Sequence, residues 1–179
     1  MSVVQGEGWR ELYPAGGGLS LHLFELAGRG VRLWQRPGES YGHVLLKALG
    51  YAMFVGEYPG LEIELSVGLR YKPDLVALNV AEGGRPRAGA RFLFWGECGL
   101  VTMRKVAWLL KHGDTQRLVL FKIGCAVAPF VRELRASVGP RYREGGRLTL
   151  VNFAADIAER AADRRIERVP ESWYTKTDV

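Results

Sequence analysis

The chain has 179 residues, of which 47% are hydrophobic and 25% charged, with a formal net charge of +6 and a pI near 9.5. This length suits one domain with a single core, and no apolar run approaches the roughly 20 residues that cross a bilayer, so a membrane-spanning protein is excluded and a second full domain is not expected. Two cysteines exclude a disulfide framework, and the lack of a basic segment followed by an apolar stretch in residues 1–8 leads us to expect a soluble, cytoplasmic protein.

Hydrophobic periodicity predicts the secondary structure. In chain order we expect strands at residues 19–26 and 31–35, a helix from Glu39 to about 56, strands at 61–67, 75–80 and 92–95, a helix at 101–112, a strand at 118–123, a helix at 127–138, a strand at 148–151, and a last helix that Asn152 caps and that runs to 163. This interleaving predicts an α/β fold, a mixed sheet flanked by helices. We expect one domain over residues 1–179, with a core at about 19–151 and a C-terminal helix and tail at 152–179.

Two acidic residues are associated with neighbouring predicted strands. Asp74 opens the strand that follows Lys72-Pro73, and Glu97 closes the strand that contains Phe94-Trp95. An antiparallel pairing would bring both carboxylates to the same end of a hairpin, where they can hold Mg²⁺ or Mn²⁺ for phosphodiester hydrolysis. Acidic residues at strand ends also occur simply as turn formers and solubilising groups, and spacing alone leaves both readings open.

Several landmarks together resemble the PD-(D/E)XK nuclease-like superfamily, and in particular its YaeQ-like branch. They are the segment 36–40 before an apolar helix, the segment 72–75, and the segment 95–99 before a basic helix, within a resemblance that spans roughly residues 19–123. The resemblance implies a restriction-endonuclease-like core and a metal-dependent nuclease that acts on DNA or RNA. It also implies that Asp74 and Glu97 are metal ligands and that Glu39 is an additional carboxylate near the metal.

The chain departs from the family pattern at Gly99, where the family places a lysine two residues after the acidic residue. The resemblance implies that the next helix supplies the missing cation, either from Arg104 or from Lys105. Arginine stabilises negative charge but stays protonated, so it does not readily act as a base. The departure makes a catalytically inactive binding or interaction module on the same fold the alternative function.

The basic composition favours an anionic partner, with nucleic acid first. Of the 25 basic residues 19 are arginine and six are lysine, which suits phosphate contacts but also fits a GC-rich genome and a merely solvated surface. The candidate phosphate contacts are Lys72, Arg85, Arg87 and Arg91, the last three in or beside a loop of glycine, proline and arginine.

Other reactive residue types have simpler interpretations. Alternation places Cys98 on the strand face opposite Glu97, as a small buried hydrophobe, and Cys125 has the same interpretation. Three isolated histidines and two distant cysteines do not suggest a zinc site. Trp95 and Trp108 are expected in the core rather than as platforms for base stacking. Three functions remain: a nuclease, an inactive nucleic-acid-binding module, and a scaffold for protein contacts, with the oligomeric state, including a homo-oligomer, left open.

Overall fold

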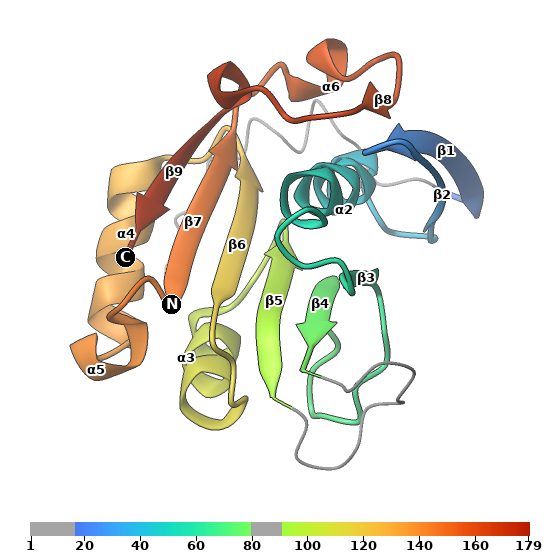
Figure 1. Ribbon diagram of the computed structural model, residues 1–179. Helices are drawn as coiled ribbons and strands as arrows, with labels where there is room; N and C mark the ends of the chain where they lie inside the picture. The colour runs from blue at the N-terminus through green and yellow to red at the C-terminus, as the bar shows by residue number, and fades with distance from the viewer. Residues whose placement is uncertain (1–16, 80–90) are drawn as a thin grey trace.

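The computed structural model describes residues 17–79 and 91–179. Figure 1 shows the arrangement of the elements in this part of the chain. The strands are β1 (Ser20–Leu26), β2 (Arg29–Gln35), β3 (Glu62–Ile63), β4 (Leu75–Leu78), β5 (Phe92–Cys98), β6 (Leu118–Ile123), β7 (Leu148–Phe153), β8 (Arg165–Ile166) and β9 (Tyr174–Asp178). The helices are α2 (Tyr41–Phe54), α3 (Met103–His112), α4 (Val127–Ser137), α5 (Pro140–Arg143), α6 (Ile157–Arg160) and the short 3₁₀-helix η1 (Glu171–Trp173).

Within these ranges the strands form two sheets. The larger has six strands in the order β3-β4-β5-β6-β7-β9, and the smaller has three in the order β2-β1-β8. Strands β5, β6 and β7 run parallel, while β4 is antiparallel to β5 and β9 is antiparallel to β7. The carboxyl ends of the three parallel strands therefore lie at one edge of the sheet, where ligands gather in open α/β folds. This is the predicted class, a single-domain mixed α/β fold.

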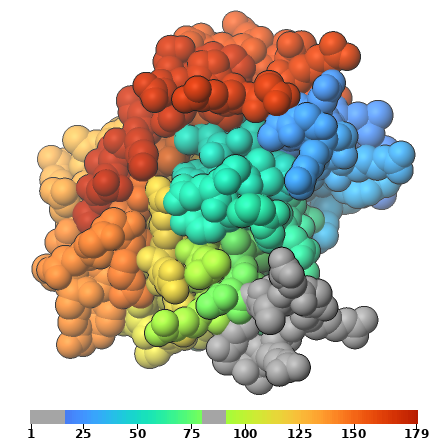
Figure 2. Space-filling view, in the orientation of Figure 1, coloured from blue at the N-terminus to red at the C-terminus, as the bar shows by residue number. Residues whose placement is uncertain are grey.

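Helix α2 lies between the two sheets, so it is apolar on nearly all sides (Figure 1). Ten of its 14 residues are buried, and its core cluster includes side chains from β1, β2, β4, β5 and β6. A Cβ at Gly50 would lie 2.6 Å from a methyl carbon of Leu75, so glycine is required where the helix approaches the large sheet. In the space-filling view part of α2 still reaches the surface between the blue N-terminal hairpin and the red C-terminal segment (Figure 2).

Helices α3 and α4 cover the opposite face of the large sheet. Their buried residues pack with Trp95, Leu118 and Leu120 in a second core cluster. Thr102 caps α3 by accepting a hydrogen bond from the Lys105 N–H, which places Lys105 in the first turn. Alternation along β5 then divides its side chains: Phe94 and Cys98 face α2, whereas Trp95 faces α3.

Most predicted elements are confirmed: β1, β2, α2, α3, β6 and α4 differ from the expected ranges by no more than about two residues at each end. The helix predicted from Glu39 begins instead at Tyr41, because Ser40 is its N-cap and accepts a hydrogen bond from the His43 N–H. The prediction that Trp95 and Cys98 are core residues is also confirmed, since both are buried. Among the described residues, no helix is long and apolar enough to cross a membrane.

The strand predicted at residues 61–67 is wrong in length, because β3 contains only Glu62 and Ile63. Glu64 has a positive φ of 57° and donates its N–H to the carbonyl of Asp74, so the chain turns there. Leu65 and Val67, which follow the turn, pack against the second core cluster from a loop and not from a strand. The turn also directs the Glu64 side chain to Lys47 of α2.

The predicted C-terminal helix is also wrong. Asn152 lies inside β7, which continues to Phe153, and its side chain accepts from the Cys125 N–H at 2.9 Å instead of capping a helix. The only helix between 152 and 163 is the four-residue α6. The segment after it adds β8 to the small sheet and β9 to the edge of the large one. Backbone pairing with β7 stabilises β9, whose sequence YTKTD has little apolar character of its own.

Candidate active site

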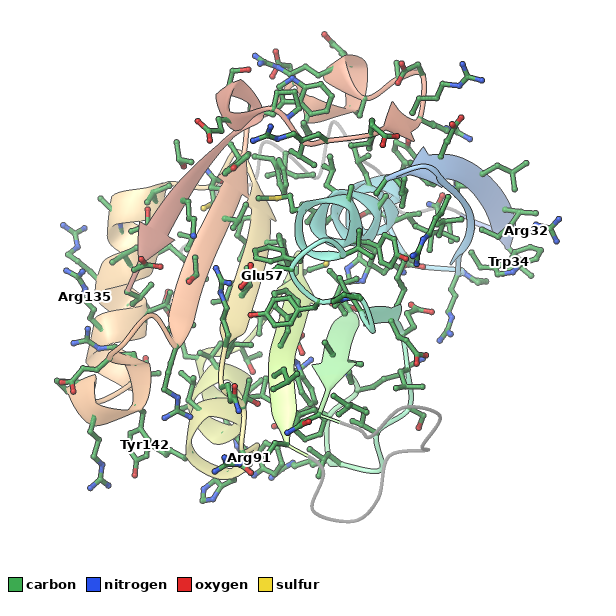
Figure 3. The ribbon with its side chains drawn as sticks, viewed as in Figure 1. Arg32, Trp34, Glu57, Arg91, Arg135 and Tyr142 are labelled. Atoms are coloured by element: carbon green, nitrogen blue, oxygen red, sulfur yellow. The ribbon has the colours of Figure 1, made fainter. Side chains whose placement is uncertain are left out.

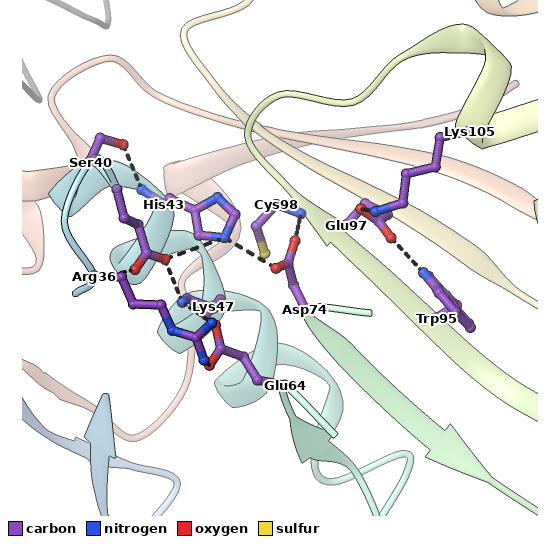
Figure 4. Close-up of polar contacts among 11 residues, drawn as sticks. Arg36, Ser40, His43, Lys47, Glu64, Asp74, Trp95, Glu97, Cys98 and Lys105 are labelled. Carbon is purple, nitrogen blue, oxygen red and sulfur yellow. Dashed lines mark hydrogen bonds and ion pairs between the residues drawn. The ribbon is translucent and has the colours of Figure 1, made fainter. Parts of the chain in front are cut away.

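The two acidic residues singled out by sequence lie at the same end of an antiparallel strand pair, as predicted. Leu75 pairs with Gly96, and the Asp74 N–H donates to the Gly96 carbonyl at 3.2 Å. Asp74 thus enters β4 opposite Glu97, near the carboxyl end of β5. Figure 4 shows the polar contacts made around both side chains.

Asp74 is held from the α2 side. Its Oδ1 lies 3.1 Å from Nε2 of His43, and its Oδ2 accepts from the Cys98 N–H at 2.7 Å. Burial raises the pKa of Asp74, but the hydrogen bond and charge of His43, with the Cys98 N–H, outweigh it and hold the pKa below its usual value. The side chain is therefore an ionised carboxylate at neutral pH.

Glu97 is held from the α3 side and is only 3% exposed. Its Oε1 accepts from Trp95 Nε1 at 2.7 Å, and its Oε2 accepts from Lys105 Nζ at 2.5 Å. Burial raises the pKa of Glu97, the Lys105 ammonium lowers it, and the charge of Asp74 raises it again, so the pKa lies above its usual value. The charges of the two acidic residues thus repel each other, although their side-chain partners, His43 and Lys105, come from different helices.

Glu39 joins Asp74 through a shared histidine. Its Oε1 lies 3.5 Å from His43 Nε2 and accepts from Lys47 Nζ at 2.6 Å, while its Oε2 accepts from the Arg36 N–H at 2.8 Å. The buried ammonium of Lys47 also donates to Glu64 Oε1 at 2.9 Å. Burial lowers the pKa of Lys47, but these two carboxylates outweigh it and raise the pKa above its usual value.

The structure distinguishes the two cations suggested for the missing lysine. Lys105 contacts Glu97, whereas Arg104 is exposed on the neighbouring position of α3. Gly99 has a φ of 70°, and a Cβ there would lie 3.4 Å from His43 Nδ1. A left-handed backbone next to the histidine disfavours any side chain at this position, so the cation reaches Glu97 from the helix.

The candidate phosphate contacts do not gather at the acidic residues. Lys72 is exposed. Burial raises the pKa of Glu64, but Lys47, then Arg36 and last Lys72 lower it, so that the pKa lies below its usual value. Arg91 lies 3.5 Å from Asp114, at the start of β5 (Figure 3). Glu97 lies six positions further along the chain, about 20 Å away at the usual rise of a strand. Arg85 and Arg87 lie outside the described residues.

Sequence reasoning missed four residues of this site: His43, Lys47, Glu64 and Lys122. Two of them had a detectable signal, because Glu39, His43 and Lys47 are spaced by four residues and so share one face where a helix forms. Glu64 had none, since its position depends on the turn after β3. Lys122 lies in β6 and donates to the carbonyl of Gly99.

The donor chemistry of Asp74 and Glu97 fits a divalent cation. Each of their four oxygens accepts one hydrogen bond from the protein and keeps a second lone pair. Within residues 17–79 and 91–179, no three His, Cys, Asp or Glu side chains are grouped to hold a metal by themselves. Two carboxylates are within the number that Mg²⁺ uses, since this ion is usually held by one or two protein carboxylates and completes its shell with water and phosphate oxygens.

Among solved structures, the chain resembles YaeQ proteins. The YaeQ protein from Pseudomonas syringae matches with a TM-score of 0.56 at 17% identity, over 90% of this chain and 89% of that chain. The YaeQ protein from Xanthomonas axonopodis pv. citri matches with a TM-score of 0.55 at 15% identity, over 84% and 82%. No protein-family model and no curated protein matches the sequence. The chain therefore has a YaeQ-like fold, and its function must be argued from the site.

Proposed function

From this YaeQ-like fold and its acidic site, we propose that the protein is a divalent-metal-dependent phosphodiesterase of the PD-(D/E)XK type that acts on nucleic acid. The observation that carries the proposal is the 2.5 Å contact between Lys105 Nζ and Glu97 Oε2. It supplies, from α3, the cation that the strand lacks at Gly99. A cation next to a carboxylate that can hold a metal is a combination that phosphodiester cleavage uses.

Each residue has a distinct role in this proposal. Asp74 and Glu97 hold the metal, which when bound polarises the phosphoryl oxygen and activates a water molecule. Lys105 stabilises the negative charge that develops on the phosphate. Glu39 orients His43, and His43 in turn orients Asp74, so Glu39 acts as a positioning residue. The net charge of +6 favours encounter with DNA or RNA.

Isosteric substitution of the proposed ligands tests this function. Supercoiled plasmid, single-stranded DNA and RNA would each be incubated with the protein and Mn²⁺. We expect cleavage by the wild type and none by Asp74→Asn or Glu97→Gln. Asp114→Asn is the matched control, because it removes one charge from an exposed acid at the other end of the sheet. Cleavage by Asp74→Asn at the wild-type rate would refute the proposed ligands.

A second pair of variants assigns the cation. Lys105→Met keeps the aliphatic stem but removes the charge next to Glu97, and we expect it to slow cleavage by about 100-fold. Arg104→Met removes a charge from the exposed neighbouring position and should change the rate by no more than about threefold. A large loss of cleavage rate in Arg104→Met together with a small one in Lys105→Met would make Arg104 the catalytic cation.

An inactive nucleic-acid-binding module is the second candidate, and one observation favours it. Each carboxylate of the site already has a partner within the protein: His43 for Asp74, Lys105 for Glu97 and Lys47 for Glu39. If these contacts only stabilise the fold, Asp74→Asn will bind oligonucleotides as tightly as the wild type does, with the same salt dependence. Neither the wild type nor the variant will then cleave them. Binding without cleavage would therefore select this candidate.

A further inference from the structure

Three lysines approach the acidic site, and they differ in their partners. Lys47 contacts the carboxylates of Glu39 and Glu64, and Lys105 contacts that of Glu97. Lys122 makes no ion pair with a carboxylate among the described residues; its ammonium instead donates to the Gly99 carbonyl and lies 4.7 Å from the centre of the Phe130 ring. It is thus a largely buried cation that has no carboxylate within ion-pair distance in residues 17–79 and 91–179.

Lys122 projects from the same face of the sheet as Glu97. In β6, Leu118 and Leu120 belong to the core cluster under α3 and α4, whereas Phe121 belongs to the α2 cluster. Alternation therefore places the Lys122 side chain on the α3 and α4 face. Cys98 pairs with Phe121, so the next residues, Gly99 and Lys122, lie side by side at the carboxyl edge of the parallel strands.

The surroundings of Lys122 disfavour its charge. Burial lowers its pKa to about 8, although interactions with Cys125 and Cys98, followed by Glu97 and Glu133, act to raise it. Burying an ammonium without a counter-ion is costly unless an anion compensates for it. One carbonyl uses a single N–H of the three that an ammonium carries, which leaves two donors for another ligand.

We propose that Lys122 binds a phosphate group of the nucleic-acid backbone beside Glu97, as a second cation that the family motif does not contain. The inference rests on the proposed function, because it assigns a substrate contact within the same site. The competing role is structural: the Lys122 ammonium, by donating to the Gly99 carbonyl, would only fix the turn after β5. Phosphate binding distinguishes the two roles, since a structural lysine has no effect on an added anion.

The test measures orthophosphate binding in EDTA by calorimetry, so that no metal or cleavage is needed. Lys122→Met should weaken binding by about tenfold or more, as expected for a lost charge-assisted hydrogen bond. Lys122→Arg should restore it to within about threefold, and Lys176→Met, which removes an exposed lysine from β9, should have no effect. Urea unfolding of each variant confirms that it is folded.

The outcomes separate this inference from the proposed function. If the wild type binds no orthophosphate, or if Lys122→Met binds it as tightly as the wild type, the inference is overturned whether or not the protein cleaves DNA. If Lys122→Met loses phosphate while neither the wild type nor any variant cleaves, the phosphate site is supported and the nuclease proposal fails. A wild type that cleaves, with a raised KM and an unchanged kcat in Lys122→Met, supports both.

Discussion

Replacement of Lys122 by methionine should stabilise the protein at neutral pH. The fall of its pKa from 10.5 to about 8 corresponds to about 3 kcal/mol of unfavourable interaction with the charged form, at about 1.4 kcal/mol per pKa unit. Methionine removes this penalty but also loses the hydrogen bond to Gly99 and the contact with Phe130, together about 1–2 kcal/mol. The expected net gain in the free energy of unfolding is therefore about 1–2 kcal/mol.

The gain should depend on pH in a defined direction. Between about pH 8 and 10.5 the unfolded chain keeps the Lys122 proton that the native protein has lost. Because stability rises with pH wherever the unfolded state binds more protons, wild-type stability increases through this window. Lys122→Met lacks that increase. Its advantage should be full near pH 7 and absent near pH 10.

Urea titrations followed by circular dichroism, at both pH values, measure this effect. With an m-value of about 2 kcal/mol/M, the gain near pH 7 raises the urea midpoint by about 0.5–1 M. Lys176→Met, at an exposed position, should stay within about 0.5 kcal/mol of the wild type at both pH values. A Lys122→Met variant that is less stable than the wild type near pH 7 would show that the charge is well compensated in the native protein. The Lys122 ammonium would then not need an added anion to offset the cost of its burial, which is one of the arguments for the phosphate site.

Four further substitutions test individual contacts by urea unfolding. Lys47→Met leaves two carboxylates without their shared buried partner and should cost about 3 kcal/mol. Asp74→Asn should cost about 1–2 kcal/mol near pH 7; because the native pKa of Asp74 lies below its usual 3.8, the difference should shrink as the pH falls through that native value. Gly99→Ala places a side chain at a φ of 70° and should cost about 1 kcal/mol or more. Trp95→Phe removes one of the two donors to the buried Glu97 and should cost about 1–3 kcal/mol.

For each of these four substitutions, one result would contradict the expectation. A Lys47→Met variant as stable as the wild type would mean that water hydrates the carboxylates of Glu39 and Glu64 in the native state. If the loss of stability in Asp74→Asn grew as the pH fell, the native pKa of Asp74 would lie above its usual value and not below it. A Gly99→Ala variant as stable as the wild type would show that the backbone at this position accepts a side chain without strain. A Trp95→Phe variant as stable as the wild type would show that Glu97 does not need the hydrogen bond from Trp95.

The secondary-structure predictions succeeded where an apolar face repeats along the chain. Helices α3 and α4 each bury one stripe, and β6 is apolar except for Lys122, so local periodicity was enough to find them. It failed for β9, because a polar edge strand owes its structure to the hydrogen bonds of β7. It also failed at Asn152, whose type suits a helix N-cap but whose amide instead binds the backbone of Cys125.

The sequence predicted the positions of Asp74 and Glu97 on the strand pair, but not the residues that contact their side chains. Asp74 and Glu97 flank apolar runs that pair in antiparallel register, so their common end of the sheet followed from pattern and pairing. Lys105 was one of two equal candidates until the orientation of α3 directed it, rather than Arg104, to Glu97. The direction of a side chain near a helix start depends on how the helix packs on the sheet, and spacing does not contain that information.

The sequence by itself determined the α/β class, the main helices and strands, and which two acidic residues lie at the same end of the β4–β5 pair, because these follow from local periodicity and from strand pairing between neighbours. Only the tertiary structure decided that α2 lies between two sheets, that His43 and Lys47 bind acidic residues from separate segments, and that Lys122 stands beside Gly99 with no carboxylate partner in the described part of the chain. Each of these contacts joins residues held by different elements. Their energies come from burial and from charges brought together by packing, which no local pattern encodes.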